Sequence, residues 1–224
     1  MILYIQTKLE GEFPLFLFVK AFQEKLLFLI RFFQSPETIG SIFPSSDALT
    51  SKLVTQIVPS RSPKKYLEVG AGTGAVTDAI IKKLGPKDTL DVVESDHALC
   101  SLLKNKYKNP NIKIYEKSIE DFEESDYDGI ISSLPFNQFS LDFVKGVFFK
   151  YLKMMKPGGF LSYYEYKYPK VCTRLLTEHR QRLEKIRDFK TEVGQKFHEK
   201  IEPVWWNLPP ADVRSIQKQG SSTL

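Results

Sequence analysis

The sequence predicts an α/β fold in which a mostly parallel sheet carries helices on both faces. Short apolar segments typical of buried strands, among them 66–69, 90–94 and 128–133, alternate with longer segments of helical periodicity. Strands that alternate with helices build crossover units, and such units form a parallel sheet. A glycine-rich turn over 70–74 joins the first of these strands to the helix that follows. In sheets of this kind a ligand binds beyond the carboxyl ends of the strands, so we expect the binding site at this turn.

Turn and capping signals position the other elements in chain order. Ser46 or Asp47 can cap a helix over 48–58, because serine and aspartate oxygens accept hydrogen bonds from the first backbone N–H groups of a helix. A helix over 75–84 ends at a Gly-Pro pair. Lys-Pro-Gly-Gly at 156–159 predicts a stop and a turn. The other expected elements are, in order, helix 98–106, strand 112–116, helix 141–155, strand 160–166, helix 171–189 and a closing pair of strands over 193–197 and 201–206.

Residues 13–34 predict an amphipathic helix with a highly aromatic surface. Seven of these residues are phenylalanine, whereas Lys20, Glu24 and Arg31 fall on one narrow arc together with two glutamines. Charges spread along the segment disfavour a membrane span, since a charge near the bilayer centre is costly. We therefore expect the helix to lie in the membrane interface, with its basic residues near anionic headgroups. The alternative is a helix packed on the core of the domain or on a second subunit.

The charge and the metal-binding residue types limit the partners. A net charge of +5 and an isoelectric point near 9.0 favour an anionic partner, either nucleic acid or an anionic membrane surface. The two cysteines, Cys100 and Cys172, lack metal or redox spacing, and the three histidines do not cluster, so we expect no metal site. Cysteines of this kind and the lack of a signal-peptide pattern indicate a cytoplasmic protein.

Two acidic residues flank the glycine-rich turn and indicate the kind of ligand. Glu68 lies two residues before the first glycine, and its carboxylate suits a cationic group better than a pyrophosphate, because like charges repel. Glu94 ends the next strand, at about the distance along the chain where an acid binds the two hydroxyls of a ribose. The pair predicts a nucleoside that carries a positively charged amino-acid end, which is S-adenosyl-L-methionine. The alternative is an ordinary turn with a solvated acid.

The turn, Glu94 and the segment 156–159 resemble the class I S-adenosylmethionine-dependent methyltransferases. A narrower resemblance, to the bacterial phospholipid N-methyltransferases, covers most of the chain. The segments that carry it are Gly-Ser-Ile-Phe-Pro-Ser-Ser at 40–46, Ser-Leu-Pro at 133–135, Tyr-Glu-Tyr at 164–166 and Asn-Leu-Pro-Pro at 207–210. That family methylates the amine of phosphatidylethanolamine, up to phosphatidylcholine. The resemblance implies a Rossmann-like, seven-stranded methyltransferase sheet, a phospholipid substrate and no nucleic-acid partner.

The resemblance also implies the cofactor-binding residues, which lie in the turn, at strand ends and in the loop before the sheet. They are Glu68, Gly70, Ala71, Gly72, Thr73, Gly74, Glu94, Ser95, Ser118, Ile119, Ser133, Leu134, Ser45 and Ser46. Ser118 stands where methyltransferases of this fold often carry an acid at the adenine edge. Recognition of the base then rests on a hydroxyl, on the Ile119 backbone or on a neighbour such as Asp96.

An ammonium headgroup must lose a proton before its nitrogen can attack a methyl group. Tyr164, Tyr166, Glu165 and Asn137 are candidates to favour the neutral amine. We take Tyr164, Tyr166 and Asn137 as the candidate catalytic residues, with the tyrosines lining the headgroup pocket, where their rings also favour the cationic product. The alternative for each tyrosine is simple core packing in a strand.

The expected domain organisation has three parts. Residues 1–47 hold the interfacial helix and a loop that can close over the cofactor, although a plain linker is an equal alternative for this loop. Residues 48–214 form the methyltransferase domain, and residues 215–224 form a disordered tail. We expect the protein to lie on the inner face of the cell membrane, bound to anionic lipid through the first helix. The oligomeric state is left open.

Three other functions remain as alternatives. An RNA adenine dimethyltransferase shares this sheet, but such enzymes usually carry Asn-Leu-Pro-Tyr or Asn-Ile-Pro-Tyr where this chain has Ser-Leu-Pro-Phe at 133–136. Their asparagine accepts from the target amine, and their aromatic residue stacks on the flipped base. A methyltransferase for a soluble amine or a protein is the second alternative. A membrane-bound scaffold without catalysis is the third, and cofactor binding separates it from the enzymes.

Overall fold

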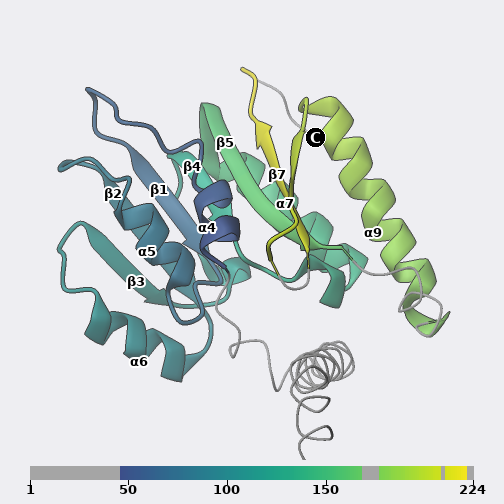
Figure 1. The fold of residues 1–224 in the computed structure, drawn as a ribbon, viewed down its shortest axis with the longest axis horizontal. Coiled ribbons are helices and arrows are strands. Elements are labelled where there is room, and N and C mark those ends of the chain that lie inside the picture. The colour runs from purple at the N-terminus through teal and green to yellow at the C-terminus, as the bar shows by residue number, and fades with distance from the viewer. Residues whose placement is uncertain (1–45, 168–176, 208–209, 221–224) are drawn as a thin grey trace, which may run out of the picture. The chain divides into compact units, whose positions relative to one another are not determined.

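The computed structural model describes residues 46–167, 177–207 and 210–220 (Figure 1). The chain divides into two units, Met1–Phe43 and Pro44–Leu224, and the described residues all belong to the second. The predicted N-terminal helix over 13–34 and Ser45 of the predicted lid loop lie outside the described residues. Among the helices that are described, none is long and apolar enough to span a membrane.

A seven-stranded, mostly parallel sheet forms the centre of the described region, as predicted (Figure 1). Its strand order is β3-β2-β1-β4-β5-β7-β6. Its strands are β1 (Lys65–Val69), β2 (Thr89–Glu94), β3 (Ile112–Glu116), β4 (Tyr127–Ser132), β5 (Met155–Tyr166), β6 (Lys200–Val204) and β7 (Ala211–Gln217). The first five are parallel, whereas β7 runs antiparallel to both β5 and β6. The carboxyl ends of β1 to β5 therefore meet at one edge of the sheet.

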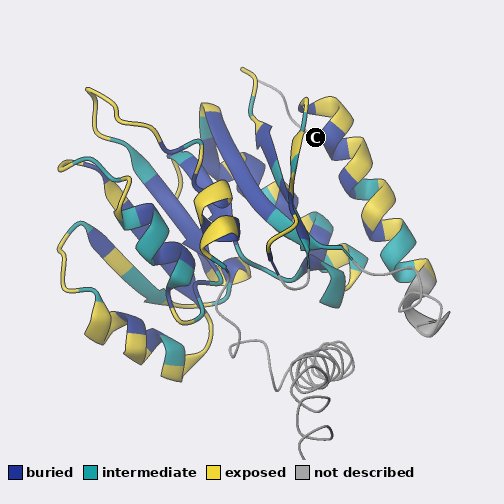
Figure 2. Cartoon of the chain, viewed as in Figure 1, coloured by how far each residue is buried: buried dark blue, intermediate teal, exposed yellow. Residues whose placement is uncertain are grey.

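Helices cover both faces of this sheet (Figure 1). One face, here called the α5 face, carries α4 (Asp47–Leu53), α5 (Ala75–Ile81) and α6 (His97–Lys106). The other, the α7 face, carries α7 (Leu141–Met154) and α9 (Thr177–Lys196). Buried residues lie between the layers, and exposed residues line the outer sides of the helices (Figure 2). The strands are largely apolar on both sides because parallel sheets are covered on both faces.

Side chains of β1 alternate between the two faces, and this alternation orients the site. Tyr66 packs into the cluster of the α5 face, whereas Leu67 and Val69 pack into the cluster of the α7 face. Successive side chains of a strand point to opposite faces. Glu68 therefore points towards α5, the helix that begins at the glycine-rich turn.

Most predicted elements are confirmed. The strand over 112–116 has the predicted bounds, and the other strands up to 133 and the helices over 75–84, 98–106 and 141–155 agree within a few residues. The helix predicted over 48–58 begins as expected but already ends at Leu53. Ser46 caps α4, since its hydroxyl oxygen accepts from Leu49 N. The predicted helix over 171–189 corresponds to α9, although residues 168–176 lie outside the described part.

Three assignments made from the sequence are wrong. Residues 193–196 are the last turn of α9 rather than a strand, and Val193 and Phe197 are both buried at the helical spacing of four. The predicted turn at 156–159 lies inside β5, whose pairing with β4 shifts register at this point. Residues 215–217 belong to β7 rather than to a disordered tail, because they pair with β5 and Ile216 is buried.

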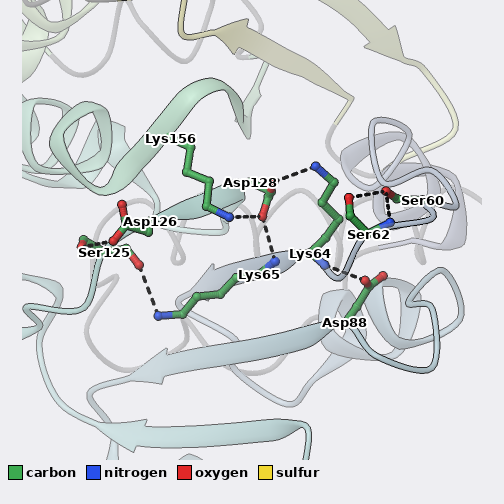
Figure 3. A network of polar contacts seen from close by, with 9 residues as sticks. All are labelled: Ser60, Ser62, Lys64, Lys65, Asp88, Ser125, Asp126, Asp128 and Lys156. Atoms are coloured by element: carbon green, nitrogen blue, oxygen red, sulfur yellow. Dashed lines mark hydrogen bonds and ion pairs between the residues drawn. The ribbon is translucent and has the colours of Figure 1, made fainter.

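A charged network joins the strands at the amino-terminal edge of the sheet, opposite the predicted site (Figure 3). The carboxylate of Asp128 accepts hydrogen bonds from Lys64 Nζ at 2.8 Å, Lys65 N at 3.0 Å and Lys156 Nζ at 2.7 Å. Burial alone would raise the pKa of Asp128, but the hydrogen bonds from Lys156 and Lys64 outweigh it and hold the pKa below its usual value. One carboxylate thus ties together the starts of β1, β4 and β5.

We expect Asp128→Asn to lower the free energy of unfolding at neutral pH by about 1–3 kcal/mol, because two lysines lose their anion. The folded-state pKa of Asp128 is depressed, so its contribution is present above the unfolded value of 3.8 and is lost as the pH falls below it. Urea denaturation at neutral and acid pH measures both effects. Asp126→Asn is the matched control, since Asp126 is exposed and its positive φ of 65° also suits asparagine. Equal losses in both variants would contradict the assignment.

Candidate active site

The glycine-rich turn lies where β1, β2 and β4 end side by side. Gly70 N donates to Val93 O of β2 at 2.9 Å, and Ser133 N donates to Val69 O of β1 at 2.9 Å. The turn, the end of β2 and the loop after β4 are therefore fixed to one another by backbone hydrogen bonds. This is the carboxyl edge of the sheet, where the sequence predicts the ligand.

Two glycines of the turn have different reasons to lack a side chain. Gly74 caps α5 with a φ of +90°, and a Cβ there would lie 2.5 Å from the Tyr107 hydroxyl oxygen. Gly72 has a φ of +56°, but a Cβ there would meet no atom within 4 Å. Gly74 is thus required by the packing of the protein itself, whereas Gly72 faces open space in which a ligand can approach the backbone.

Glu94 is fixed against the turn by three backbone N–H groups. Its Oε2 accepts from Gly72 N at 2.9 Å, and its Oε1 accepts from Ser95 N at 2.8 Å and from Asp96 N at 3.0 Å. A carboxylate has about four acceptor positions, so it retains capacity for a ligand hydroxyl. This arrangement fits the predicted role of Glu94 towards ribose hydroxyls and holds the carboxylate in one orientation.

Glu68 is completely buried beneath the turn. Neither carboxylate oxygen has a hydrogen-bond partner among the described residues. Burial raises the pKa of Glu68 to about 8; the hydroxyl and backbone of Thr77 oppose this rise, and the charge of Glu94 adds to it. The oxygens do not reach the surface of the site, so a direct contact with a cationic ligand requires the turn or the side chain to move. The cofactor role of Glu68 stays a prediction.

The loop after β4 adds a second buried polar atom without a partner. Ser133 Oγ is buried and meets no hydrogen-bond partner in the described part of the chain. Leu134, the next residue, lies against Gly70, since a Cβ on that glycine would stand 3.1 Å from Leu134 Cδ2. The Ser133 hydroxyl, the Glu94 carboxylate and the open side of Gly72 fit a ligand with several polar atoms. S-adenosylmethionine is such a ligand.

The residues predicted to recognise the base lie where β2 and β3 end. Lys117 N donates to Glu94 O at 3.0 Å, which brings these two strand ends together. Ser118 Oγ caps the short helix η1 (Ile119–Asp121) by accepting from Glu120 N, and the Ile119 side chain is buried. Asp96 Oδ1 caps α6 by accepting from Leu99 N. Both polar side chains are thus oriented by helix ends, and each keeps further hydrogen-bonding capacity.

The structure does not bring the three candidate catalytic residues to one face of the sheet. Ser132 at the end of β4 pairs with Tyr163, so β5 extends three residues beyond β4. The Tyr164 and Tyr166 rings pack edge to face at 5.2 Å on the α5 face. Asn137, in the helix η2 (Phe136–Gln138), contacts α9 on the α7 face, where its Oδ1 accepts from Lys190 Nζ at 3.5 Å. The tyrosines and Asn137 therefore stand on opposite sides of the strand end.

Glu165 belongs to a buried charged cluster that the sequence analysis did not predict. Its carboxylate pairs with Lys190 of α9 and with Arg214 Nε of β7, the latter at 2.8 Å. Arg214 also donates to Glu199 at 2.6 Å, which in turn accepts from the Tyr163 hydroxyl at 2.7 Å. Burial and then the charge of Arg214 lower the pKa of Lys190. In the sequence, the only indication that Lys190 is buried was its position four residues after the apolar Ile186, which lies on the inner side of α9.

Arg182 is a second cation that sequence reasoning missed. Its Nε is buried and has no partner among the described residues, and its Nη2 donates to Asn137 O at a long 3.5 Å. A guanidinium has five N–H donors, so the buried Nε–H of Arg182 is one that a ligand could bind. An anionic group bound near Asn137 would satisfy it.

Ser46 links the start of the described chain to its last loop. Ser46 N donates to the Oδ1 of the buried Asn207 at 3.2 Å. Asn207 is the first residue of the Asn-Leu-Pro-Pro motif and follows β6, so it ties the cap of α4 to the chain after this strand. The predicted contact of Ser46 with the cofactor stays a prediction.

Comparison with known proteins gives the same class of fold. A protein family described as "Methyltransferase domain" matches residues 67–159. The chain is 28% identical over 143 residues to an ornithine lipid N-methyltransferase of Singulisphaera acidiphila, a match that covers 59% of this chain and 73% of that protein. It is 30% identical over 104 residues to a ribosomal RNA small subunit methyltransferase A of a Hydrogenobaculum species, covering 46% of this chain and 40% of the other.

A solved structure extends the likeness in fold. Phosphoethanolamine N-methyltransferase 2 of Haemonchus contortus, in complex with S-adenosyl-L-methionine, superposes with a TM-score of 0.58 at 13% identity. The superposition covers 78% of this chain and 53% of that protein, so this chain spans about half of its length. The fold that it shares with this chain is one that binds S-adenosyl-L-methionine.

We expect Glu68→Gln to reduce the pH dependence of stability. The pKa of Glu68 is raised from 4.5 to about 8, so between these values the folded protein binds more protons than the unfolded chain. The contribution of Glu68 is therefore fully present below the lower value and falls as the pH rises towards the upper one, by at most about 1.4 kcal/mol per pH unit. Urea denaturation across this range, without cofactor, should give a smaller decline with pH in the variant.

Glu123→Gln is the control for this measurement, because Glu123 is an exposed carboxyl on the loop that follows η1. It should leave the slope of stability against pH as in the wild type. Equal slopes in wild type and Glu68→Gln would show that Glu68 ionises normally in the folded protein.

Proposed function

The chain is a class I S-adenosylmethionine-dependent methyltransferase, and we propose that it methylates the amine of a lipid headgroup at a membrane surface. Phosphatidylethanolamine, converted towards phosphatidylcholine, is the lipid we propose first. The observation that supports this most is the Tyr164–Tyr166 pair, which extends beyond the end of β4 at the edge that carries the cofactor turn. The similarity to an ornithine lipid N-methyltransferase supports an amine on a lipid as the acceptor.

S-adenosylmethionine supplies an electrophilic methyl group, so the protein mainly has to position a neutral amine. Tyrosine rings attract cations through their faces, and the Tyr164–Tyr166 pair offers such faces for an ammonium and for its methylated product. Burial raises the pKa of Tyr166, so its phenol stays protonated and acts as a hydrogen-bonding group rather than as a base. The proton of the ammonium therefore leaves through water or through another group of the site.

The cations on the α7 face are candidates for the anionic part of such a headgroup, provided that the lipid passes around the strand end that separates them from the tyrosines. Phosphatidylethanolamine and ornithine lipids both combine an amine with an anionic group, a phosphate or a carboxylate. Arg182 has unused donors beside Asn137, whereas Lys190 already has Glu165 as its counter-ion. We assign the anionic group of the headgroup to Arg182, because a guanidinium binds phosphate and carboxylate in the same two-pronged geometry.

We propose that the protein acts from the cytoplasm as a peripheral protein on the inner face of the cell membrane. The net charge of +5 and the predicted interfacial helix over 13–34 support binding to anionic lipid. RNA adenine methylation is the second candidate, favoured by the match to a ribosomal RNA methyltransferase over 104 residues. Against it stands the serine at position 133, where such enzymes usually carry asparagine.

The test is methyl transfer from radiolabelled S-adenosylmethionine by the purified full chain. Parallel reactions contain anionic vesicles alone, vesicles with phosphatidylethanolamine, vesicles with ornithine lipid, and stripped ribosomal RNA. We expect label in lipid only where an amine headgroup is present, with phosphatidylethanolamine labelled best. Label in ornithine lipid alone would correct the headgroup, and label in RNA alone would overturn the lipid assignment.

We expect Arg182→Gln to raise the KM for the lipid substrate about tenfold or more while the affinity for S-adenosylmethionine stays unchanged. The reason is that the variant loses the cation assigned to the anionic group of the headgroup. Arg187→Gln is the matched control, because Arg187 lies on the same helix but is exposed. Lipid kinetics and calorimetric titration of the cofactor measure the two quantities. A parallel loss of cofactor affinity would instead point to a general disturbance of the site.

A further inference from the structure

Both tryptophans of the sequence stand together in the loop between β6 and β7, and both are exposed. Trp206 is 91% exposed and Trp205 is 64% exposed. An indole side chain is large, and leaving it in water forgoes the burial that normally stabilises it. Adjacent exposed aromatic residues of this kind mark an interaction surface rather than ordinary surface variation.

This loop is fixed at both ends, so the indoles are presented on a rigid base. Before them, Val204 is buried; after them, buried Asn207 accepts from Ser46 N. Lys167 N donates to Pro210 O at 2.7 Å, and Lys167 Nζ lies 4.3 Å from the centre of the Trp205 ring. The tryptophans are therefore held outward by contacts with the end of β5 and the start of α4.

The loop lies at the same edge of the sheet as the candidate headgroup site. Tyr166 pairs with Ala211 of β7, and Ala211 pairs with Val204 of β6, so the three residues form one row across the sheet. Trp205 follows Val204 directly. The tryptophan pair thus stands two strands away from β5, with β7 between, level with the end of the strand that carries Tyr164 and Tyr166.

We propose that Trp205 and Trp206 insert into the headgroup region of an anionic bilayer and turn the carboxyl edge of the sheet towards it. Tryptophan favours the membrane–water interface, because its ring is apolar and its N–H bonds to headgroups. Lys167, beside the Trp205 ring, already pairs with Asp212 at 2.9 Å, so the net charge of +5 is what complements anionic lipid. The proposal deepens the proposed lipid function, since a headgroup amine reaches this edge when the edge faces the bilayer.

Tryptophan fluorescence of the unmodified full chain tests this directly, because every tryptophan of the sequence is in this loop. Vesicles of phosphatidylglycerol and phosphatidylcholine should shift the emission to shorter wavelength. Vesicles with brominated acyl chains should quench it, most strongly when the bromine is shallow. Co-sedimentation with vesicles but no shift and no quenching would overturn the proposal. A blue shift that grows with protein concentration without lipid would overturn it in favour of a contact between copies of the chain.

Variants separate this surface from the chemistry. Trp205→Ala with Trp206→Ala should weaken vesicle binding roughly tenfold or more, while affinity for S-adenosylmethionine and thermal stability stay unchanged. Phe149→Ala is the control, because Phe149 is exposed on α7, away from this edge. Vesicle binding equal to that of the control would contradict the proposal. Fluorescence needs no methyl transfer, so insertion without lipid methylation would refute the proposed function alone.

Discussion

The convergence of three backbone N–H groups on the Glu94 carboxylate is the contact on which the rest of the site depends. It joins the end of β2 to the turn after β1 through Gly72, and to the start of α6 through Ser95 and Asp96. The glycines of the turn adopt left-handed backbone conformations. Glycine is flexible, so these residues alone do not fix the conformation of the turn. A charged acceptor that binds the N–H of Gly72 selects one conformation. The acid predicted to contact the cofactor thus also shapes the surface that receives it.

The buried acids Glu68 and Glu165 are stabilised in opposite ways. Glu68 has no partner in the described chain and retains its proton to a higher pH, which removes the charge. Glu165, by contrast, lies between Lys190 and Arg214, so its buried carboxylate has two basic partners. A lone buried carboxyl is an unstable arrangement that ligand binding can alter, whereas a paired cluster holds α9 to the sheet in one position.

The sequence was sufficient for the parts of the fold that local patterns encode. Short stretches of sequence were enough to predict the glycine turn, the buried strands and the acids at 68 and 94. The structure places the turn, the strands and Glu94 where the sequence predicted them. Residues whose role depends on distant partners were missed. Lys190 and Arg182 look like solvated charges on a helix until Asn137 and Glu165 are brought beside them. The last turn of α9 was mistaken for a strand because Val193 and Phe197 are too few to separate a spacing of four from one of two.

The hydrogen bond from Ser46 to Asn207 spans 161 residues of sequence. During synthesis on the ribosome, the glycine turn and the first four strands emerge long before Asn207 exists. The cofactor half of the sheet can therefore assemble while the cap of α4 still lacks this partner. Closing so long a loop carries an entropic penalty that earlier contacts must already have reduced. We therefore expect the contact between the cap of α4 and Asn207 to form after the parallel half of the sheet has assembled.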